Sequence, residues 1–264
     1  MLLSLENLSV SYRDDEGSVT PAAVNVNLTL DRGEVLGIVG ESGSGKSSVA
    51  MSVPRLLPSP PAFWPEGRIL FDGKDLLTTS LEELRRIRGK RIGVVFQDPM
   101  GSLSPLHRIG DQLVEMIRLH EDVSSAAARE RAFEWLEKVG ISDPTVRAAA
   151  YPHELSGGMQ QRVMIAMALM LEPDLLIADE PTTALDVTIQ AQVLKLMKAL
   201  HRANSAVLLI THDLGVVSQM ATKLAVMKDG RVIETAESPD EFFKNPHHPY
   251  SRTLVGEAKK MEVE

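Results

Sequence analysis

Residues 40–47 form a glycine-rich segment whose residue types suit the binding of a phosphate chain. The segment reads Gly-Glu-Ser-Gly-Ser-Gly-Lys-Ser, follows the short apolar run Val35–Val39 and precedes a predicted helix that begins around Lys46. Glycines permit tight turns in which successive N–H groups point at phosphate oxygens, and the positive end of the following helix adds to the attraction. Lys46 is then placed to reach the β- and γ-phosphates, and the Ser47 hydroxyl to bind Mg²⁺. The alternative, a flexible Gly/Ser loop with a chance lysine, does not account for the strand and helix on either side.

Two carboxylates follow another apolar run, Leu175–Ala178. They belong to Asp179 and Glu180. At the end of a central parallel strand, Asp179 can hold Mg²⁺ through water, and Glu180 is placed to activate an attacking water as a general base. Taken alone, the pair fits an ordinary strand end equally well. Together with the glycine-rich segment, it predicts a site that cleaves a phosphate bond.

A third motif, Leu155–Arg162, lies between these two and reads Leu-Ser-Gly-Gly-Met-Gln-Gln-Arg. A glycine pair again opens a helix, so that N–H groups and the Ser156 hydroxyl face an anion. The motif resembles the signature of ATP-binding cassette (ABC) ATPases, usually LSGGQ, with Met159 in place of the first Gln. The resemblance implies that Ser156, Gly157 and Gly158 contact the γ-phosphate of ATP bound by the other cassette of a head-to-tail dimer.

Four further positions match the cassette family, and the resemblance gives each a role. Gln97 resembles the Q-loop glutamine, which contacts Mg²⁺ or water and senses the transmembrane partner. Asp186 resembles the D-loop aspartate at the dimer interface, and His212 resembles the switch histidine that holds the γ-phosphate and the general base. Tyr12 stands where the family places an aromatic that stacks on adenine; a packed strand aromatic is the alternative there.

The expected site therefore has three overlapping groups of residues and implies ATP and Mg²⁺ as cofactors. The catalytic residues are Glu180, His212 and Gln97, and the metal ligands are Ser47, Gln97 and Asp179. The nucleotide contacts are Tyr12, Gly40, Glu41, Ser42, Gly43, Ser44, Gly45, Lys46, Ser47, Ser48, Ser156, Gly157, Gly158 and Asp186.

Longer runs resemble the peptide/nickel importer branch of the ABC family. These runs are Phe96–Pro105, Asp179–Thr188 and Phe242–Arg252. Peptide-importing relatives usually carry Asn where Ser104 stands, and many have a longer C-terminal extension whose cysteines bind an iron–sulfur cluster. This sequence has no cysteine, which excludes that cluster here. Peptides, nickel or a metal-chelate or opine-like solute all remain open as the transported solute.

The resemblance implies an ATPase subunit that drives a membrane importer from the cytoplasmic face of the inner or plasma membrane, as a peripheral protein. Two cassettes, identical or different, would close over two ATP molecules, and closure would reach two permease subunits docked near Gln97–Met100. An extracytoplasmic solute-binding protein would act through the permeases. The alternative is a soluble ABC ATPase that acts on DNA or ribosomes. Those relatives need coiled-coil insertions, zinc-binding cysteines or tandem cassettes, which this sequence lacks, so no nucleic-acid partner is expected.

The elements expected around these motifs alternate between strands and helices. Strands are expected at 2–12, 24–30, 35–39, 68–71, 91–96, 175–178, 206–210, 224–227 and 231–233, and helices near 109–140 and 187–200. This pattern indicates an α/β protein. The resemblance specifies a P-loop NTPase (RecA-like) core with an N-terminal antiparallel β subdomain and an inserted ABC-specific helical subdomain. We expect one ABC ATPase domain over 1–264, with its core at about 1–100 and 157–233, its helical subdomain at about 101–156 and a short C-terminal tail at 234–264.

Composition sets outer limits on the function. The chain has 28 Lys and Arg against 36 Asp and Glu, a formal net charge of −8, which argues against a protein that wraps nucleic acid. The longest apolar stretch, Val163–Leu171, is followed by Glu172 and Asp174 and falls well short of the roughly 18 residues that a membrane-spanning helix needs. Met1–Glu6 lacks the basic and apolar regions of a secretory signal.

Overall fold

The computed structural model describes residues 1–182 and 187–261. The chain divides into two compact units, one formed by Met1–Leu84 with the segment from Arg202 onward, the other by Arg85–His201. Both units combine strands and helices, which confirms the predicted α/β class. The finer division into a core and a helical subdomain stays a prediction.

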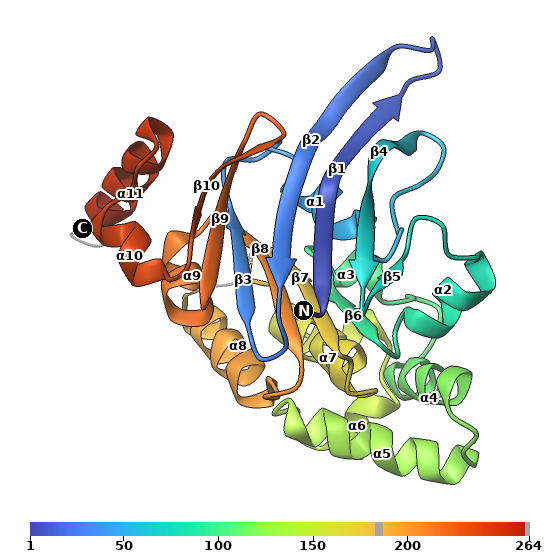
Figure 1. The fold of residues 1–264 in the computed structure, drawn as a ribbon. Helices are drawn as coiled ribbons and strands as arrows, with labels where there is room; N and C mark the ends of the chain where they lie inside the picture. Colours follow the sequence, from blue (N-terminus) through green and yellow to red (C-terminus); the bar gives the residue numbers. More distant parts are fainter. Residues whose placement is uncertain (183–186, 262–264) are drawn as a thin grey trace. The chain divides into compact units, whose positions relative to one another are not determined.

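An antiparallel sheet in the first unit has the order β2-β1-β4-β5. Its strands are β1 (Leu3–Arg13), β2 (Val19–Leu30), β4 (Ala62–Phe71) and β5 (Lys74–Asp75). β1 and β2 form the long hairpin visible in Figure 1, whose pairing runs from Leu3 opposite Leu30 to Arg13 opposite Val19. β2 and β4 are longer than the predicted strands. The sequence pattern did not reveal their additional residues, because these are mostly exposed and carry no apolar alternation.

A second set of strands in this unit has the order β10-β9-β3-β8. β3 (Val35–Val39) is buried throughout and runs parallel to β8 (Ala206–Thr211) and β9 (Lys223–Lys228), and β10 (Arg231–Ala236) pairs antiparallel with β9. Such continuous burial is typical of a central parallel strand. Helix α1 (Lys46–Ser52) follows β3 after the glycine-rich loop, and α9 (Leu214–Met220) follows β8. The loop between β3 and α1 and the loop between β8 and α9 therefore both lie at the carboxyl ends of these parallel strands.

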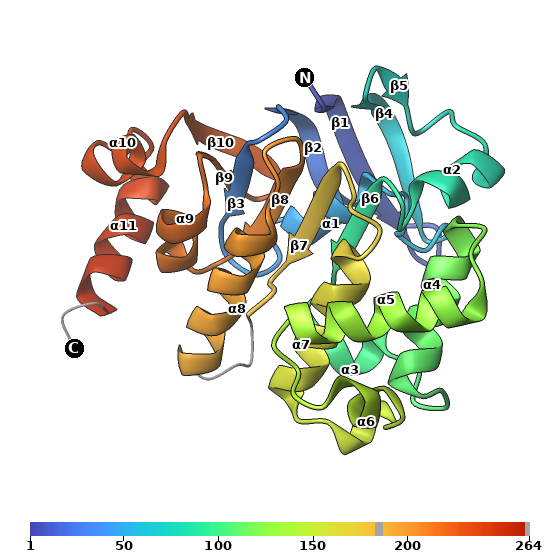
Figure 2. The same cartoon turned by 90° about the horizontal axis from the view of Figure 1, so that it is seen from below.

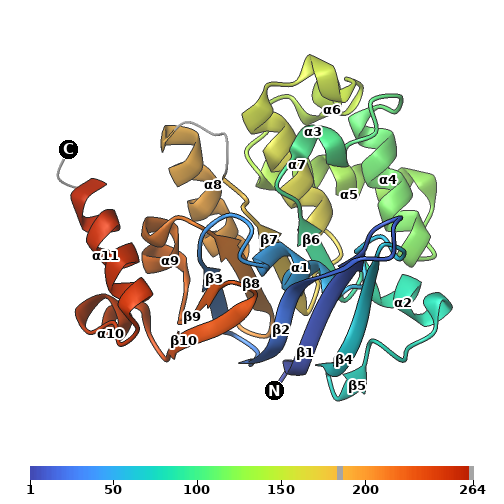
Figure 3. The same cartoon turned by 90° about the horizontal axis from the view of Figure 1, so that it is seen from above.

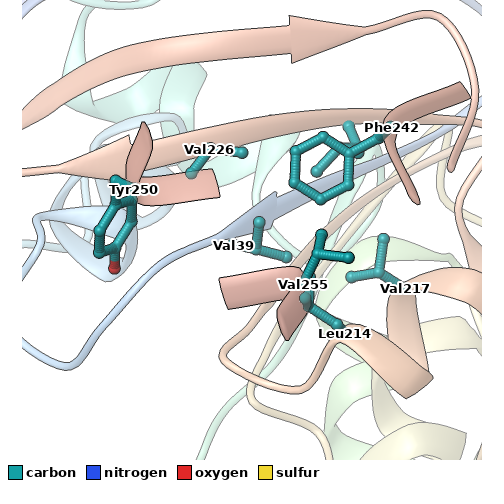
Figure 4. Close-up of a cluster of buried hydrophobic side chains, with 8 residues drawn as sticks. Val39, Leu214, Val217, Val226, Phe242, Tyr250 and Val255 are labelled. Carbon is teal, nitrogen blue, oxygen red and sulfur yellow. The ribbon is translucent and has the colours of Figure 1, made fainter. Parts of the chain in front are cut away.

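The tail of the first unit is folded onto these strands. Helices α10 (Pro239–Lys244) and α11 (Pro249–Met261) lie beside α9, in red in Figure 3. Together these elements bury one hydrophobic cluster, drawn in Figure 4, that contains Val39, Leu214, Val217, Leu224, Val226, Phe242, Tyr250 and Val255. The tail therefore shares a core with the strand that leads into the glycine-rich loop.

In the second unit, β6 (Ile92–Val95) and β7 (Leu175–Asp179) pair in parallel. Its helices are α3 (Pro99–Ser102), α4 (Ile109–His120), α5 (Ser125–Lys138), α6 (Pro144–Ala148), α7 (Gly157–Leu169) and α8 (Val187–Leu200), with a 3-10 turn at Pro152–Glu154. Helix α2 (Leu81–Ile87) spans the sequence position at which the units divide. Figure 2 shows α4, α5 and α6 grouped together.

The helical segment predicted near 109–140 consists of the two helices α4 and α5. The Ser124 hydroxyl accepts the Ala127 N–H and caps the start of α5, and Gly140, with φ of 76°, follows its end. These are the residue types that favour helix ends. None of the helices that the structure describes is long and apolar enough to cross a membrane.

Candidate active site

The glycine-rich loop connects β3 to α1 in the first unit and fits closely against its neighbours. Gly40 and Gly45 have φ values of 152° and 95°. A Cβ at Gly40 would lie 2.1 Å from the Met227 carbonyl oxygen, and a Cβ at Gly45 would lie 2.1 Å from the Ala22 carbonyl oxygen. Both positions therefore require glycine, and the loop is held between β2 and the end of β9.

Lys46 lies beneath this loop. Its side chain is only 4% exposed, and Nζ donates to the carbonyl oxygens of Gly40 at 2.8 Å and Glu41 at 2.7 Å. The ammonium group is thus fixed inside the turn, beside the exposed Ser47 at the start of α1. A fixed cation, a tight glycine turn and a hydroxyl are the donor set that a phosphate chain with Mg²⁺ needs, so these residues fit such a group.

Three more predicted site residues, Tyr12, Ser48 and His212, lie near the loop's ends. The Tyr12 hydroxyl of β1 lies 3.0 Å from the Ser48 hydroxyl of α1, which places the half-buried tyrosine beside the helix that follows the loop. His212 is the first residue after β8, whose last residue, Thr211, pairs with Val39. His212 and the start of the glycine-rich loop therefore occupy the same edge of the parallel strands.

In the second unit, Gln97 and Glu180 are hydrogen-bonded: Nε2 of the amide donates to Oε2 of the carboxylate at 3.1 Å. The pairing of Val95 with Ala178 explains this geometry, since Gln97 and Glu180 each lie two residues beyond this pair. Glu180 adopts a φ of 45°, a left-handed conformation that costs a non-glycine residue roughly 1 kcal/mol. Strain of this kind often marks functional positions. Asp179, 7% exposed, ends β7 directly before it.

Ser156 caps α7, the helix that the glycine pair was predicted to open. Its hydroxyl accepts the Met159 N–H at 3.4 Å, and Gly157 and Gly158 form the first turn of the helix. A Cβ at Gly158 would lie 3.2 Å from Cγ2 of Ile189 in α8, so the second glycine also permits close helix packing. Ser156 and Gly157 are exposed, which leaves this helix start open to an external group.

The structure places the predicted residues in three groups. Tyr12, Ser48, His212 and the loop belong to the first unit. The second unit holds the Gln97–Glu180 pair with Asp179 and, separately, the start of α7. Asp186 lies outside the described residues.

Sequence reasoning missed residues that hold the site in place. Gln161, 2% exposed, donates from Nε2 to the Pro181 carbonyl oxygen at 2.6 Å and so fixes the residue after Glu180. Gln161 lies within the signature motif Leu155–Arg162, so the sequence indicated only that it belongs to the helix. Asp213 caps α9 by accepting the Gly215 N–H at 2.7 Å, and an Asp before an apolar helix was an available signal.

Comparisons with known proteins agree with this geometry. Residues 23–183 match the sequence model of the ABC transporter family. The chain is 50% identical over 262 residues to the oligopeptide transport ATP-binding protein OppD of Bacillus subtilis (strain 168), covering 99% of this chain and 73% of that protein. It is 49% identical over 263 residues to the dipeptide transport ATP-binding protein DppD of the same organism, covering 99% and 78%.

A solved structure confirms the fold. The dimeric, post-hydrolysis state of an ATP-binding cassette bound to ADP and Pi aligns with a TM-score of 0.79 at 32% identity and covers 89% of this chain and 98% of that chain. The predicted P-loop ABC fold is therefore correct. By its sequence and its fold, the chain belongs to the ABC transporter family.

Proposed function

We propose that this chain is the ATP-hydrolysing subunit of a membrane importer of peptides. The carrying observation is the match over 99% of the chain, at about half identity, to two peptide-transport ATP-binding proteins. ABC ATPase domains bind ATP with Mg²⁺, and this chain is such an ATPase. When bound, ATP supplies the phosphoanhydride bond whose cleavage drives transport.

The glycine-rich loop and Lys46 bind the phosphates in this proposal. Lys46 already lies inside the loop, held by the carbonyl oxygens of Gly40 and Glu41, so its charge needs little reorganisation to act on an anion. Ser47, Gln97 and Asp179 would hold Mg²⁺, since hydroxyl, amide and carboxylate oxygens are the ligands that this ion prefers. Tyr12 and Ser48 would contact the nucleotide from β1 and α1.

Glu180 acts as the general base. Its carboxylate accepts a proton from the attacking water, and the Gln97 amide orients that carboxylate by donating to Oε2 at 3.1 Å. His212, at the end of β8, donates toward the terminal phosphate and the base. In this proposal Glu180 is the proton acceptor, and Gln97 and His212 are the groups that orient it.

The family works as dimers that act with membrane permeases, and this chain does so too. In our proposal the exposed start of α7, with Ser156, Gly157 and Gly158, serves the nucleotide bound by a second cassette arranged head to tail. The subunit would sit peripherally at the cytoplasmic face of the membrane, and a solute-binding protein would deliver peptide to the permeases.

Reconstitution tests the proposal directly. The chain would be assembled in vesicles with the permeases, partner cassette and solute-binding protein encoded by neighbouring reading frames. We expect ATP hydrolysis to rise when the binding protein carries a peptide. Stimulation by a nickel chelate but not by any peptide would contradict the peptide assignment while leaving the ATPase intact, and strong salt-sensitive DNA binding would contradict the importer itself.

A further inference from the structure

The C-terminal helix α11 contacts the glycine-rich loop through one side chain. Oη of Tyr250 accepts the backbone N–H of Glu41 at 3.1 Å. The carbonyl oxygen of Glu41 in turn accepts Nζ of Lys46 at 2.7 Å and the Ser44 N–H at 3.2 Å. Glu41 therefore has its N–H held by the C-terminal helix and its carbonyl group held by the loop lysine.

Tyr250 is firmly placed to make this contact. Its ring is 9% exposed and lies at the edge of the hydrophobic cluster with Val226, and Nζ of Lys228 lies 4.7 Å from its centroid. Figure 4 shows its hydroxyl pointing away from the other side chains of this cluster. A buried hydroxyl without a hydrogen-bond partner costs free energy. The ring orientation in which Oη accepts the Glu41 N–H is therefore favoured. Burial, together with the nearby carboxylates of Glu41 and Asp229, raises the pKa of Tyr250, so the hydroxyl keeps its proton.

The turn before α11 is fixed by polar contacts as well. The carboxylate of Glu234, in β10, accepts the N–H groups of His247 at 2.8 Å and His248 at 2.9 Å. Nδ1 of His248 then accepts the N–H of Tyr250 at 3.1 Å. These contacts thus fix the backbone at Tyr250 relative to β10. β10 pairs with β9, and β9 pairs with β3.

The loop is supported from different sides along its length. Its later part contacts β2 and the turn after β9, where the Gly230 N–H donates to the Ser44 carbonyl oxygen at 3.2 Å. In its first part, the N–H of Glu41 donates to the Tyr250 hydroxyl. A purely structural tyrosine would contribute its ring to the cluster, whereas this one also directs its polar atom to a peptide group that binds Lys46.

We propose that Tyr250 is a positioning residue for the phosphate-binding loop, so that the C-terminal helix helps to set the affinity for ATP. By holding the Glu41 N–H, it orients the planar Gly40–Glu41 peptide group, whose Gly40 carbonyl oxygen accepts Nζ of Lys46 at 2.8 Å. This inference rests on the proposed function of the loop.

The Tyr250→Phe variant of the full chain tests it, because Phe keeps the ring and loses only Oη. Hydrogen exchange of the Glu41 amide, followed by NMR in the nucleotide-free protein, should become about ten-fold faster. The KM for ATP should rise about three- to ten-fold with kcat nearly unchanged. The matched control is Phe242→Leu, which weakens the same cluster at a side chain that is 1% exposed; this variant should unfold at a lower temperature with wild-type KM.

The outcomes separate this inference from the proposed function. Unchanged exchange at Glu41 in Tyr250→Phe would overturn the inference, and so would an equal rise in KM in Phe242→Leu, which would show a general loss of stability. A wild-type chain that fails to bind ATP would contradict the proposed function alone, since the exchange measurement uses no nucleotide.

Discussion

The amide of Gln97 donates to the carboxylate of Glu180 across 3.1 Å, from Nε2 to Oε2. The two side chains come from segments that are far apart in sequence, and the parallel pairing of β6 with β7 brings them together. The Gln97 amide thus binds one oxygen of this carboxylate. The pair thus fixes both the position and the orientation of the proposed base.

Glu180→Gln removes the base and keeps the shape. We expect turnover to fall at least about 100-fold, because an amide cannot accept the proton from water. ATP binding should persist, and the variant should accumulate as a closed dimer by size-exclusion chromatography with ATP. Hydrolysis at a near-normal rate would contradict the assignment of Glu180.

Lys46→Ala removes the buried ammonium group from the loop. Affinity for ATP should fall about 10-fold or more, since hydrogen bonds to charged groups contribute about 1.5–3 kcal/mol. Calorimetric titration with ATP measures this loss. Lys195→Ala, at an exposed position of α8, removes the same charge from the surface and should bind ATP normally.

Ser156→Arg places a bulky cation at the exposed start of α7. A single chain should still bind ATP, while hydrolysis by dimers of this chain should be lost, because the group serves the opposite subunit. Mixing Ser156→Arg with Glu180→Gln provides the sharper measurement, since a mixed dimer contains one site in which both residues are wild type. Recovery of activity on mixing is expected, and its failure would argue against a shared site.

Gly45→Ala tests the close fit of the loop. The new Cβ would lie 2.1 Å from the Ala22 carbonyl oxygen at a φ of 95°, so the free energy of unfolding should fall by about 3 kcal/mol and ATP binding should be lost. Gly17→Ala is the matched control, with a φ of 86° and no atom within 4 Å of its Cβ. It should cost about 1 kcal/mol in chemical denaturation and leave ATP binding intact.

Glu234→Gln tests the turn before α11 and its dependence on pH. Burial raises the pKa of Glu234, but hydrogen bonds to its carboxylate, including those from the N–H groups of His247 and His248, outweigh this effect, so the net pKa is lowered. A lowered folded-state pKa means stability that is present at neutral pH and lost only as the pH falls below about 4.3, the ordinary glutamate value.

The variant should lower the free energy of unfolding at pH 7 by about 1 kcal/mol. The difference from wild type should shrink as the pH falls through the folded-state pKa, measured by urea denaturation at several pH values. A difference that stays constant down to pH 3 would show that the carboxylate charge is not what holds the turn.

The loops and strand ends that carry the site were predictable because their chemistry is local. The glycine spacing at Gly40 and Gly45, and the two carboxylates at the end of β7, are visible within a few residues of sequence. The cap of α5 is equally local, since Ser124 and the Ala127 N–H that it accepts lie three residues apart. In each case one segment contains both the signal and its physical cause.

Contacts between distant segments were not predictable in the same way. The bond from Gln161 to Pro181 and the bond from Glu41 to Tyr250 depend on how separate elements pack, and neither glutamine nor tyrosine reveals its partner by type. The long hairpin of β1 and β2 was underestimated because its exposed residues need no apolar pattern when the backbone ladder already satisfies their N–H and C=O groups.

The parallel pairing of β3 with β8 and β9 has a consequence for the order of events during biosynthesis. β3 is made early, yet its register partners, from Val207 opposite Val35 to Val226 opposite Val39, leave the ribosome far later. Closing contacts of such long sequence separation is slow. A nascent chain therefore exposes the unpaired edges of an apolar strand throughout most of translation. ATP can bind and stabilise the fold only when synthesis has passed β9.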